Sequence, residues 1–153
     1  MNETETCNSR TGTDDTPGVV GVTATAEVTG WDEHDYDLTE GLPRLAEIKI
    51  DNAYRGELEA TGSSRGQMVY RNDNNAEFTA LERVSGRLGD RTGTFVVRTG
   101  GVFESGIVIY DWTIVPGSAT GELVGLTGGG RMTWRHGESG DLSFTYTLQP
   151  EGN

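Results

Sequence analysis

Apolar and polar residues alternate at every second position along most of this chain, and that feature constrains the fold more than any other. In "VGVTATAEV", residues 20–28, Val and Ala fall on one face while Thr and Glu fall on the other. "AEIKIDNAY", residues 46–54, repeats the pattern. A period of two is that of a β-strand with one buried and one wet face. Because no segment shows the 3.6-residue period of an amphipathic helix, the sequence predicts an all-β protein.

Segments with strand character recur at hairpin spacing. We predict eight of them, at residues 20–28, 46–54, 67–71, 76–88, 92–99, 102–115, 130–136 and 141–148. Turn-forming runs such as "NDNN", "GDR" and "GESG" separate them. Strands of this number and regularity predict a sandwich or a closed antiparallel barrel, and closure removes exposed strand edges. We therefore expect a single antiparallel closed β-barrel of about eight strands.

The two ends of the chain lack this pattern. Residues 1–18 are polar and end at Pro17 and Gly18, so we expect a flexible, disordered leader, a barrel domain over residues 19–149 and a short tail over residues 150–153. The start has neither the basic region nor the apolar region of a secretory signal peptide. No apolar run approaches the roughly 18 residues that span a bilayer. A cytoplasmic location is the resulting expectation.

Charge and cysteine content narrow the partners and cofactors. The net charge is −12, with no run of Lys or Arg, so we expect neither nucleic acid nor an anionic membrane as a partner. The only cysteine is Cys7, which excludes an intrachain disulfide and a zinc site built on thiolates. We find no calcium-loop or nucleotide-loop spacing and expect no metal or cofactor, although a carboxylate site for a hard cation stays open.

The stretch "PGSATGELVGLTGGG", residues 116–130, concentrates glycines and small hydroxyl residues between two predicted strands. Pro116 ends the strand before it, since proline cannot donate to a β-ladder. Leu123 and Leu126 give the segment an apolar side. We interpret it as a plug or crossover at one end of the barrel. A nest of backbone N–H groups for an anion is the alternative, but a phosphate loop would carry a lysine.

Part of this stretch, "TGELVGLTGGG", resembles the crossover of allene oxide cyclases and dirigent proteins. Together with "GWDEHDY" and "LERVSGRLGDRTGTFVVRTGG", it makes residues 20–148 similar to an uncharacterised bacterial family of small barrels with the allene-oxide-cyclase-like fold. The resemblance implies that fold. Allene oxide cyclases use a glutamate, an asparagine and a cysteine, and no cysteine occurs in the predicted barrel, so that residue set does not carry over as a unit.

Glu82 is the candidate catalytic residue that the alternation singles out. It shares the predicted inward face with Phe78, Ala80 and Val84, where no other charge occurs. Burial would raise the pKa of its carboxyl and suit it to proton transfer near neutral pH. Two alternatives stay open: a structural pairing with an arginine or a backbone amide, and a one-residue slip at a bulge that exposes Glu82. Tyr70 and Tyr110 complete the catalytic candidates.

Other inward positions carry aromatic or polar side chains that would suit a small-molecule cavity. The predicted binding residues are Asn52, Tyr54, Phe78, Trp112, Met132, Trp134, His136 and Tyr146. A plain packed core is the alternative for this set. His34 lies in "WDEHDYD", which we interpret as a solvated acidic loop.

The function that follows is a cofactor-free cyclase or isomerase acting on a small apolar molecule in the cavity. By analogy with allene oxide cyclases, and because a cavity is inferred, we expect an intramolecular cyclisation in bacterial natural-product biosynthesis of the polyketide type. A non-catalytic barrel that binds a small lipophilic ligand is the main alternative, and a structural or stress-related oligomer is the third. Because "GIVIYDWTIV" is apolar on both faces, we also expect a homodimer that covers Ile107 and Ile109.

Overall fold

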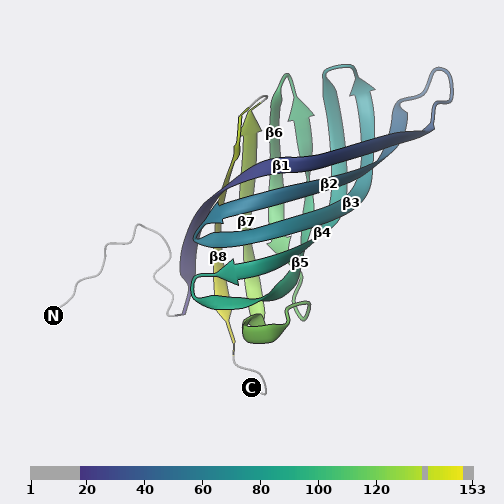
Figure 1. Cartoon of the computed structure of the whole chain (residues 1–153). Coiled ribbons are helices and arrows are strands. Elements are labelled where there is room, and N and C mark those ends of the chain that lie inside the picture. Colours follow the sequence, from purple (N-terminus) through teal and green to yellow (C-terminus); the bar gives the residue numbers. More distant parts are fainter. Residues whose placement is uncertain (1–17, 136–137, 150–153) are drawn as a thin grey trace.

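The computed structural model describes residues 18–135 and 138–149, and these form one closed antiparallel β-barrel (Figure 1). Each strand pairs with its neighbours in the chain, and the last strand pairs with the first. The strands are β1 (Val20–Asp37), β2 (Arg44–Gly56), β3 (Leu58–Asn72), β4 (Asn75–Leu88), β5 (Arg91–Glu104), β6 (Ile107–Ile114), β7 (Leu126–Arg135) and β8 (Gly140–Leu148). The predicted fold class is confirmed. Apart from Gly18, the predicted leader lies outside the described residues, and so does the predicted tail.

Unequal strand lengths make the barrel one-sided. Strands β1 to β5 have 13 to 18 residues each, whereas β6, β7 and β8 have 8, 10 and 9. The seam between β1 and β8 pairs only residues 20–26 of β1, and residues 30–37 of β1 pair only with β2. The far ends of β1 and β2 therefore extend past the short strands, as Figure 1 shows.

Several predicted element assignments are wrong, and one of them is β7, which begins at Leu126, four residues before the predicted segment 130–136. Strand β3 begins at Leu58, nine residues before the predicted segment 67–71; its inward positions after Leu58 are the small residues Ala60, Gly62, Ser64 and Gly66, which give little apolar signal. The predicted strand 102–115 is divided by a turn at Ser105 and Gly106, both with positive φ (53° and 88°), and β5 runs through residues 100–101. "WDEHDYD" is strand rather than loop, because backbone pairing with β2 orders it, and His34 is an exposed residue of that strand.

The lower half of the barrel is a packed aromatic core. The fully buried ring of Trp112 lies 4.5 Å from the ring of Phe144 and 6.0 Å from that of Phe95, centroid to centroid. Tyr54 meets Trp112 edge to face at 6.3 Å. Such tilted and edge-to-face contacts are the favoured geometry for aromatic pairs. The inward side chains of this half therefore pack against one another as the hydrophobic core.

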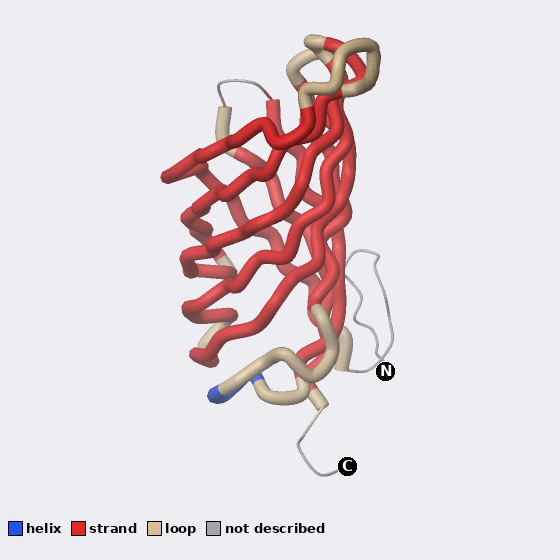
Figure 2. Tube along the Cα trace, turned by 90° about the vertical axis from the view of Figure 1, so that its right-hand side faces the viewer, coloured by secondary structure: helices blue, strands red, loops and turns tan. Residues whose placement is uncertain are grey.

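The glycine-rich crossover closes the lower end of this core. It contains a single 3-10 turn, η2 (Gly121–Leu123), whose Leu123 is buried among the core residues (Figures 1 and 2). The backbone N–H of Thr120 donates to the carbonyl of Thr94 at 2.8 Å. Any side chain at Gly93 would clash with the carbonyl of Thr120, so glycine allows the close approach. The interpretation as a plug is confirmed for residues 116–125, whereas residues 126–130 belong to β7.

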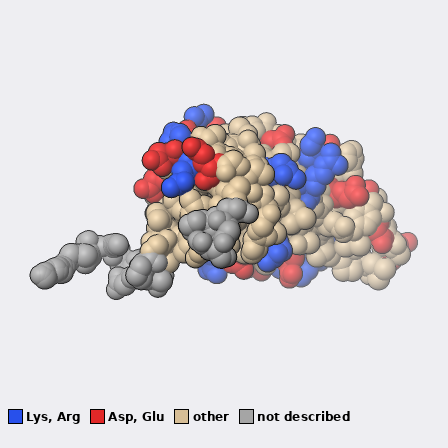
Figure 3. Space-filling model, turned by 90° about the horizontal axis from the view of Figure 1, so that it is seen from below, with Lys and Arg blue, Asp and Glu red and all other residues tan. Residues whose placement is uncertain are grey.

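The outer surface is polar and carries both signs of charge. Seen from below, Lys and Arg side chains lie near Asp and Glu side chains rather than in one patch (Figure 3). Ile107 and Ile109 point away from the barrel interior, and Ile109 is exposed in the single chain. Among the described residues, no helix has the length and apolar character to cross a membrane. The cytoplasmic location stays a prediction.

Candidate functional site

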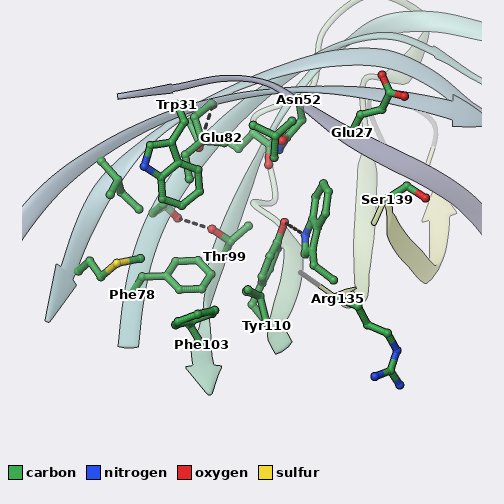
Figure 4. A pocket seen from close by; sticks show the side chains of 18 of the residues that line it. Glu27, Trp31, Asn52, Phe78, Glu82, Thr99, Phe103, Tyr110, Arg135 and Ser139 are labelled. Atoms are coloured by element: carbon green, nitrogen blue, oxygen red, sulfur yellow. Dashed lines mark hydrogen bonds between the residues drawn. The ribbon is translucent and has the colours of Figure 1, made fainter. Parts of the chain in front are cut away.

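The upper half of the barrel encloses a cavity of about 650 Å³ (Figure 4). Between residues 60 and 66 the inner face of β3 carries only small residues, Ala60, Gly62, Ser64 and Gly66, and the carboxylate of Glu82 occupies the space beside Gly62. Six aromatic side chains line the wall, namely Trp31, Tyr70, Phe78, Phe103, Tyr110 and Trp134. A concave, mostly apolar space of this size suits a small-molecule ligand.

Glu82 lies on the wall of this cavity and points inward, as the alternation on β4 predicted. Its side chain is 2% exposed. The Oε2 atom accepts hydrogen bonds from the hydroxyl of Tyr54 at 2.6 Å and from Nδ2 of Asn52 at 3.3 Å. Any side chain at Gly62 would clash with this carboxylate, so the glycine provides its place. One oxygen of Glu82 is thus fixed by β2, and Oε1 accepts no hydrogen bond from a described residue.

The electrostatic surroundings of Glu82 disfavour its ionised form. Burial raises the pKa of the carboxyl above its ordinary value, and the hydrogen bonds from Tyr54 and Asn52 offset this only in part. None of the ion pairs among the described residues involves Glu82. The alternative in which an arginine pairs with Glu82 therefore finds no partner in the described part of the chain.

The two candidate tyrosines differ in their surroundings. The hydroxyl of Tyr110, in the cavity wall, accepts a hydrogen bond from Nε1 of Trp134 at 3.2 Å, and burial raises its pKa. Tyr70 donates to Oε2 of Glu33 at 2.5 Å, and the guanidinium of Arg44 lies 3.7 Å from its ring centroid. Burial and the bond to Glu33 raise the pKa of Tyr70 to about 12. Both hydroxyls stay protonated at neutral pH.

The predicted binding residues divide into two groups. Asn52, Phe78 and Trp134 line the cavity. The others that the structure describes do not, and they are Tyr54, Trp112, Met132 and Tyr146. The first three of these are buried in the packed core below the cavity, and Tyr146 lies opposite Val20 at the far end of β8. The alternation predicts whether a side chain points into the barrel, but not where along the barrel axis it lies. His136 lies outside the described residues.

Comparison with known proteins now identifies the family. DUF3224, described as a protein of unknown function, matches residues 22–146. The chain belongs to the DUF3224 family. The crystal structure of a family member from Shewanella oneidensis MR-1, itself of unknown function, is similar with a TM-score of 0.65 and 26% sequence identity. That match covers 86% of this chain and 99% of the other. No curated protein matches the chain.

Four polar residues of the cavity in this DUF3224 protein were not predicted from the sequence. Ser64 and Thr99 are buried hydroxyl residues of the wall, while Glu27 and Glu138 line its opening. The small residues of β3 were the one available signal, since "ATGSSRG" cannot fill a barrel interior. Within residues 18–135 and 138–149, no three His, Cys, Asp or Glu side chains converge on a possible metal position.

Proposed function

We propose that this DUF3224 protein is a cofactor-free enzyme that isomerises or cyclises a small, largely apolar molecule by acid–base chemistry. The observation that carries the proposal is Glu82, a carboxyl group without a cationic partner among the described residues on the wall of an apolar cavity. A carboxyl group whose pKa is raised by burial can exchange a proton near neutral pH.

The geometry supports different roles for the two oxygens of this carboxyl group and for Tyr110. Tyr54 and Asn52 hold Oε2, which leaves Oε1 to take or give the proton. Tyr110 accepts from Trp134 and retains its own hydroxyl hydrogen, so it can donate to a carbonyl oxygen of the substrate. The aromatic wall restricts a flexible substrate to conformations near the reactive one, which lowers the entropic part of the barrier.

The resemblance of the crossover and its flanking motifs to allene oxide cyclases and dirigent proteins supports a cyclisation of the kind found in natural-product biosynthesis. The resemblance does not transfer the catalytic glutamate, asparagine and cysteine of allene oxide cyclases, because the described barrel has no cysteine. The second candidate is a non-catalytic carrier of a small lipophilic molecule. The cavity volume and its aromatic wall support that candidate equally, so the experiment must detect proton transfer as well as binding.

Ring opening of 5-nitrobenzisoxazole tests the proposed proton transfer directly. In this reaction a base removes the proton on C3 while the N–O bond breaks, and the probe is neutral, flat and apolar. We expect the wild-type protein to accelerate the reaction over buffer and Glu82→Gln to lower that rate by roughly a hundredfold. Gln keeps the size of the side chain and can accept from Tyr54, so its melting temperature should stay near that of the wild type.

Glu47→Gln is the matched control, because Glu47 is exposed on the outer side of β2. It should leave the rate unchanged. Binding of the probe without acceleration would support the carrier instead. A rate that is equal in wild type and Glu82→Gln would remove Glu82 from the chemistry.

A further inference from the structure

The carboxyl and cationic side chains that line the cavity are Glu27, Glu82 and Glu138 against Arg135. Its other titratable groups are the hydroxyls of Tyr70 and Tyr110. Arg135 is exposed and extends away from Glu82 in the close view of the site (Figure 4). Within the described part of the chain, Glu82 therefore has no positive charge beside it, and the opening above it carries two carboxylates against one guanidinium.

Two buried hydroxyl groups of the wall have their hydrogens already engaged, whereas the hydroxyl of Tyr110 keeps its hydrogen. The hydroxyl of Ser64 donates to the carbonyl of Ile50 at 3.2 Å, and that of Thr99 donates to the carbonyl of Ala80 at 3.4 Å. With their hydrogens used, both oxygens are left to accept. The wall around Glu82 is thus rich in acceptors.

Asn52 shows the same excess of acceptors most clearly. Its Nδ2 donates to Glu82, and its Oδ1 is buried without a hydrogen-bond partner among the described residues. Turning the amide over would place a carbonyl oxygen against the carboxylate, so this orientation is the one that an ionised Glu82 requires. A buried acceptor left unpaired is costly, and a donor from a bound molecule would remove that cost.

The aromatic side chains supply the remaining recognition. Phe78 and Tyr110 meet edge to face, with ring centroids 5.2 Å apart and planes at 82°. Aromatic faces attract cations, and they also cover apolar surface. The cavity therefore combines a buried carboxyl group, an unpaired acceptor at Oδ1 of Asn52 and aromatic rings.

We propose that the molecule bound in this cavity is a protonated amine with an apolar body, whose ammonium group pairs with Glu82 and donates to Asn52. This inference rests on the proposed function, since it names the ligand class of the same cavity. The apolar body lies against the aromatic wall, and the carboxylates of Glu27 and Glu138 at the opening favour the entry of a cation over that of an anion.

Four probes that share a naphthalene ring separate the contributions of charge, hydrogen bonding and apolar contact to the affinity. They are 1-naphthylmethylamine, 1-naphthylmethanol, 1-methylnaphthalene and 1-naphthoate. Their affinities for the full-length protein are measured by isothermal titration calorimetry at pH 7. We expect the amine to bind at least tenfold more tightly than the alcohol or the hydrocarbon, and 1-naphthoate to bind most weakly. Glu82→Gln should remove the advantage of the amine and leave 1-methylnaphthalene unchanged, while Glu47→Gln should change neither.

The outcomes separate this inference from the function on which it rests. Equal affinities of the amine and 1-methylnaphthalene for the wild type would overturn the amine preference and leave a cavity that binds apolar molecules. An amine advantage that survives Glu82→Gln in a folded variant would also overturn it. If none of the four probes binds the wild type, both the amine preference and the ligand site are wrong.

Discussion

The substitution Tyr54→Phe removes one hydroxyl group and tests whether its hydrogen bond to Glu82 stabilises the folded protein. The Tyr54 hydroxyl is buried, donates to Oε2 of Glu82 at 2.6 Å and accepts from Nε1 of Trp112 at 3.4 Å. Phe fills nearly the same volume, so the substitution removes hydrogen bonds without making a large void. It should also raise the pKa of Glu82, because the hydrogen bond from Tyr54 lowers that pKa.

The short bond to the carboxylate accounts for most of the expected loss. A hydrogen bond to a charged group contributes about 1.5–3 kcal/mol, whereas one between neutral groups contributes about 1 kcal/mol. The bond from Trp112 is long, so its loss adds little. We therefore expect Tyr54→Phe to lower the free energy of unfolding by about 2 kcal/mol, which is a fall of about 4–8 °C in Tm for a domain of this size.

Urea denaturation followed by circular dichroism, at a pH above the pKa of Glu82, measures this loss. In a Glu82→Gln background, the cost of Tyr54→Phe should fall to about 1 kcal/mol, because the acceptor is then neutral. Tyr36→Phe is the matched control: its hydroxyl donates to Gln67 at 2.7 Å on the exposed surface, and its loss should cost less than about 0.5 kcal/mol. A Tyr54→Phe variant as stable as Tyr36→Phe would refute the reasoning.

Two further predictions concern pH and self-association. The pKa of Glu82 is higher in the folded protein than in the unfolded chain, so between these two pKa values the folded state binds more protons. The free energy of unfolding of the wild type, relative to that of Glu82→Gln, should therefore fall as the pH rises from about 4.3 through the folded pKa. A flat difference between the two proteins over pH 4 to 8 would show that Glu82 is not desolvated. Replacing both Ile107 and Ile109 by Lys should give a folded monomer by sedimentation, since we expect these outward residues to be covered in a homodimer; a wild-type protein that already sediments as a monomer would show this to be wrong.

Much of the architecture could be predicted, because the alternation that specifies a strand is local in the sequence. It correctly placed Glu82 inside the barrel and Ile109 outside. It failed where inward positions carry no side chain. Gly62 and Gly66 carry no apolar side chain that would mark an inward face, so the first half of β3 was not predicted.

The division of the barrel into a packed half and an open half could not be predicted from local pattern. Asn52 and Tyr54 are two residues apart on the same inward face, yet Asn52 lines the cavity and Tyr54 lies in the core. Their heights depend on the tilt of the strands and on the short β1–β8 seam, which are set by pairings between distant residues. The support of Glu82 by Tyr54, across 28 positions in the chain, depends on the same pairings.

The central claim is that Glu82 lies desolvated on the wall of a cavity that holds an apolar molecule. Carbon-13 NMR of the glutamate side-chain carboxyl groups measures this directly, with Glu82→Gln to assign the resonance. We predict that the Glu82 resonance titrates above 4.5, the ordinary value, and that adding 1-methylnaphthalene moves its midpoint higher, because the ligand displaces water from the cavity. A Glu82 resonance that titrates at or below 4.5 and does not respond to 1-methylnaphthalene would contradict the claim.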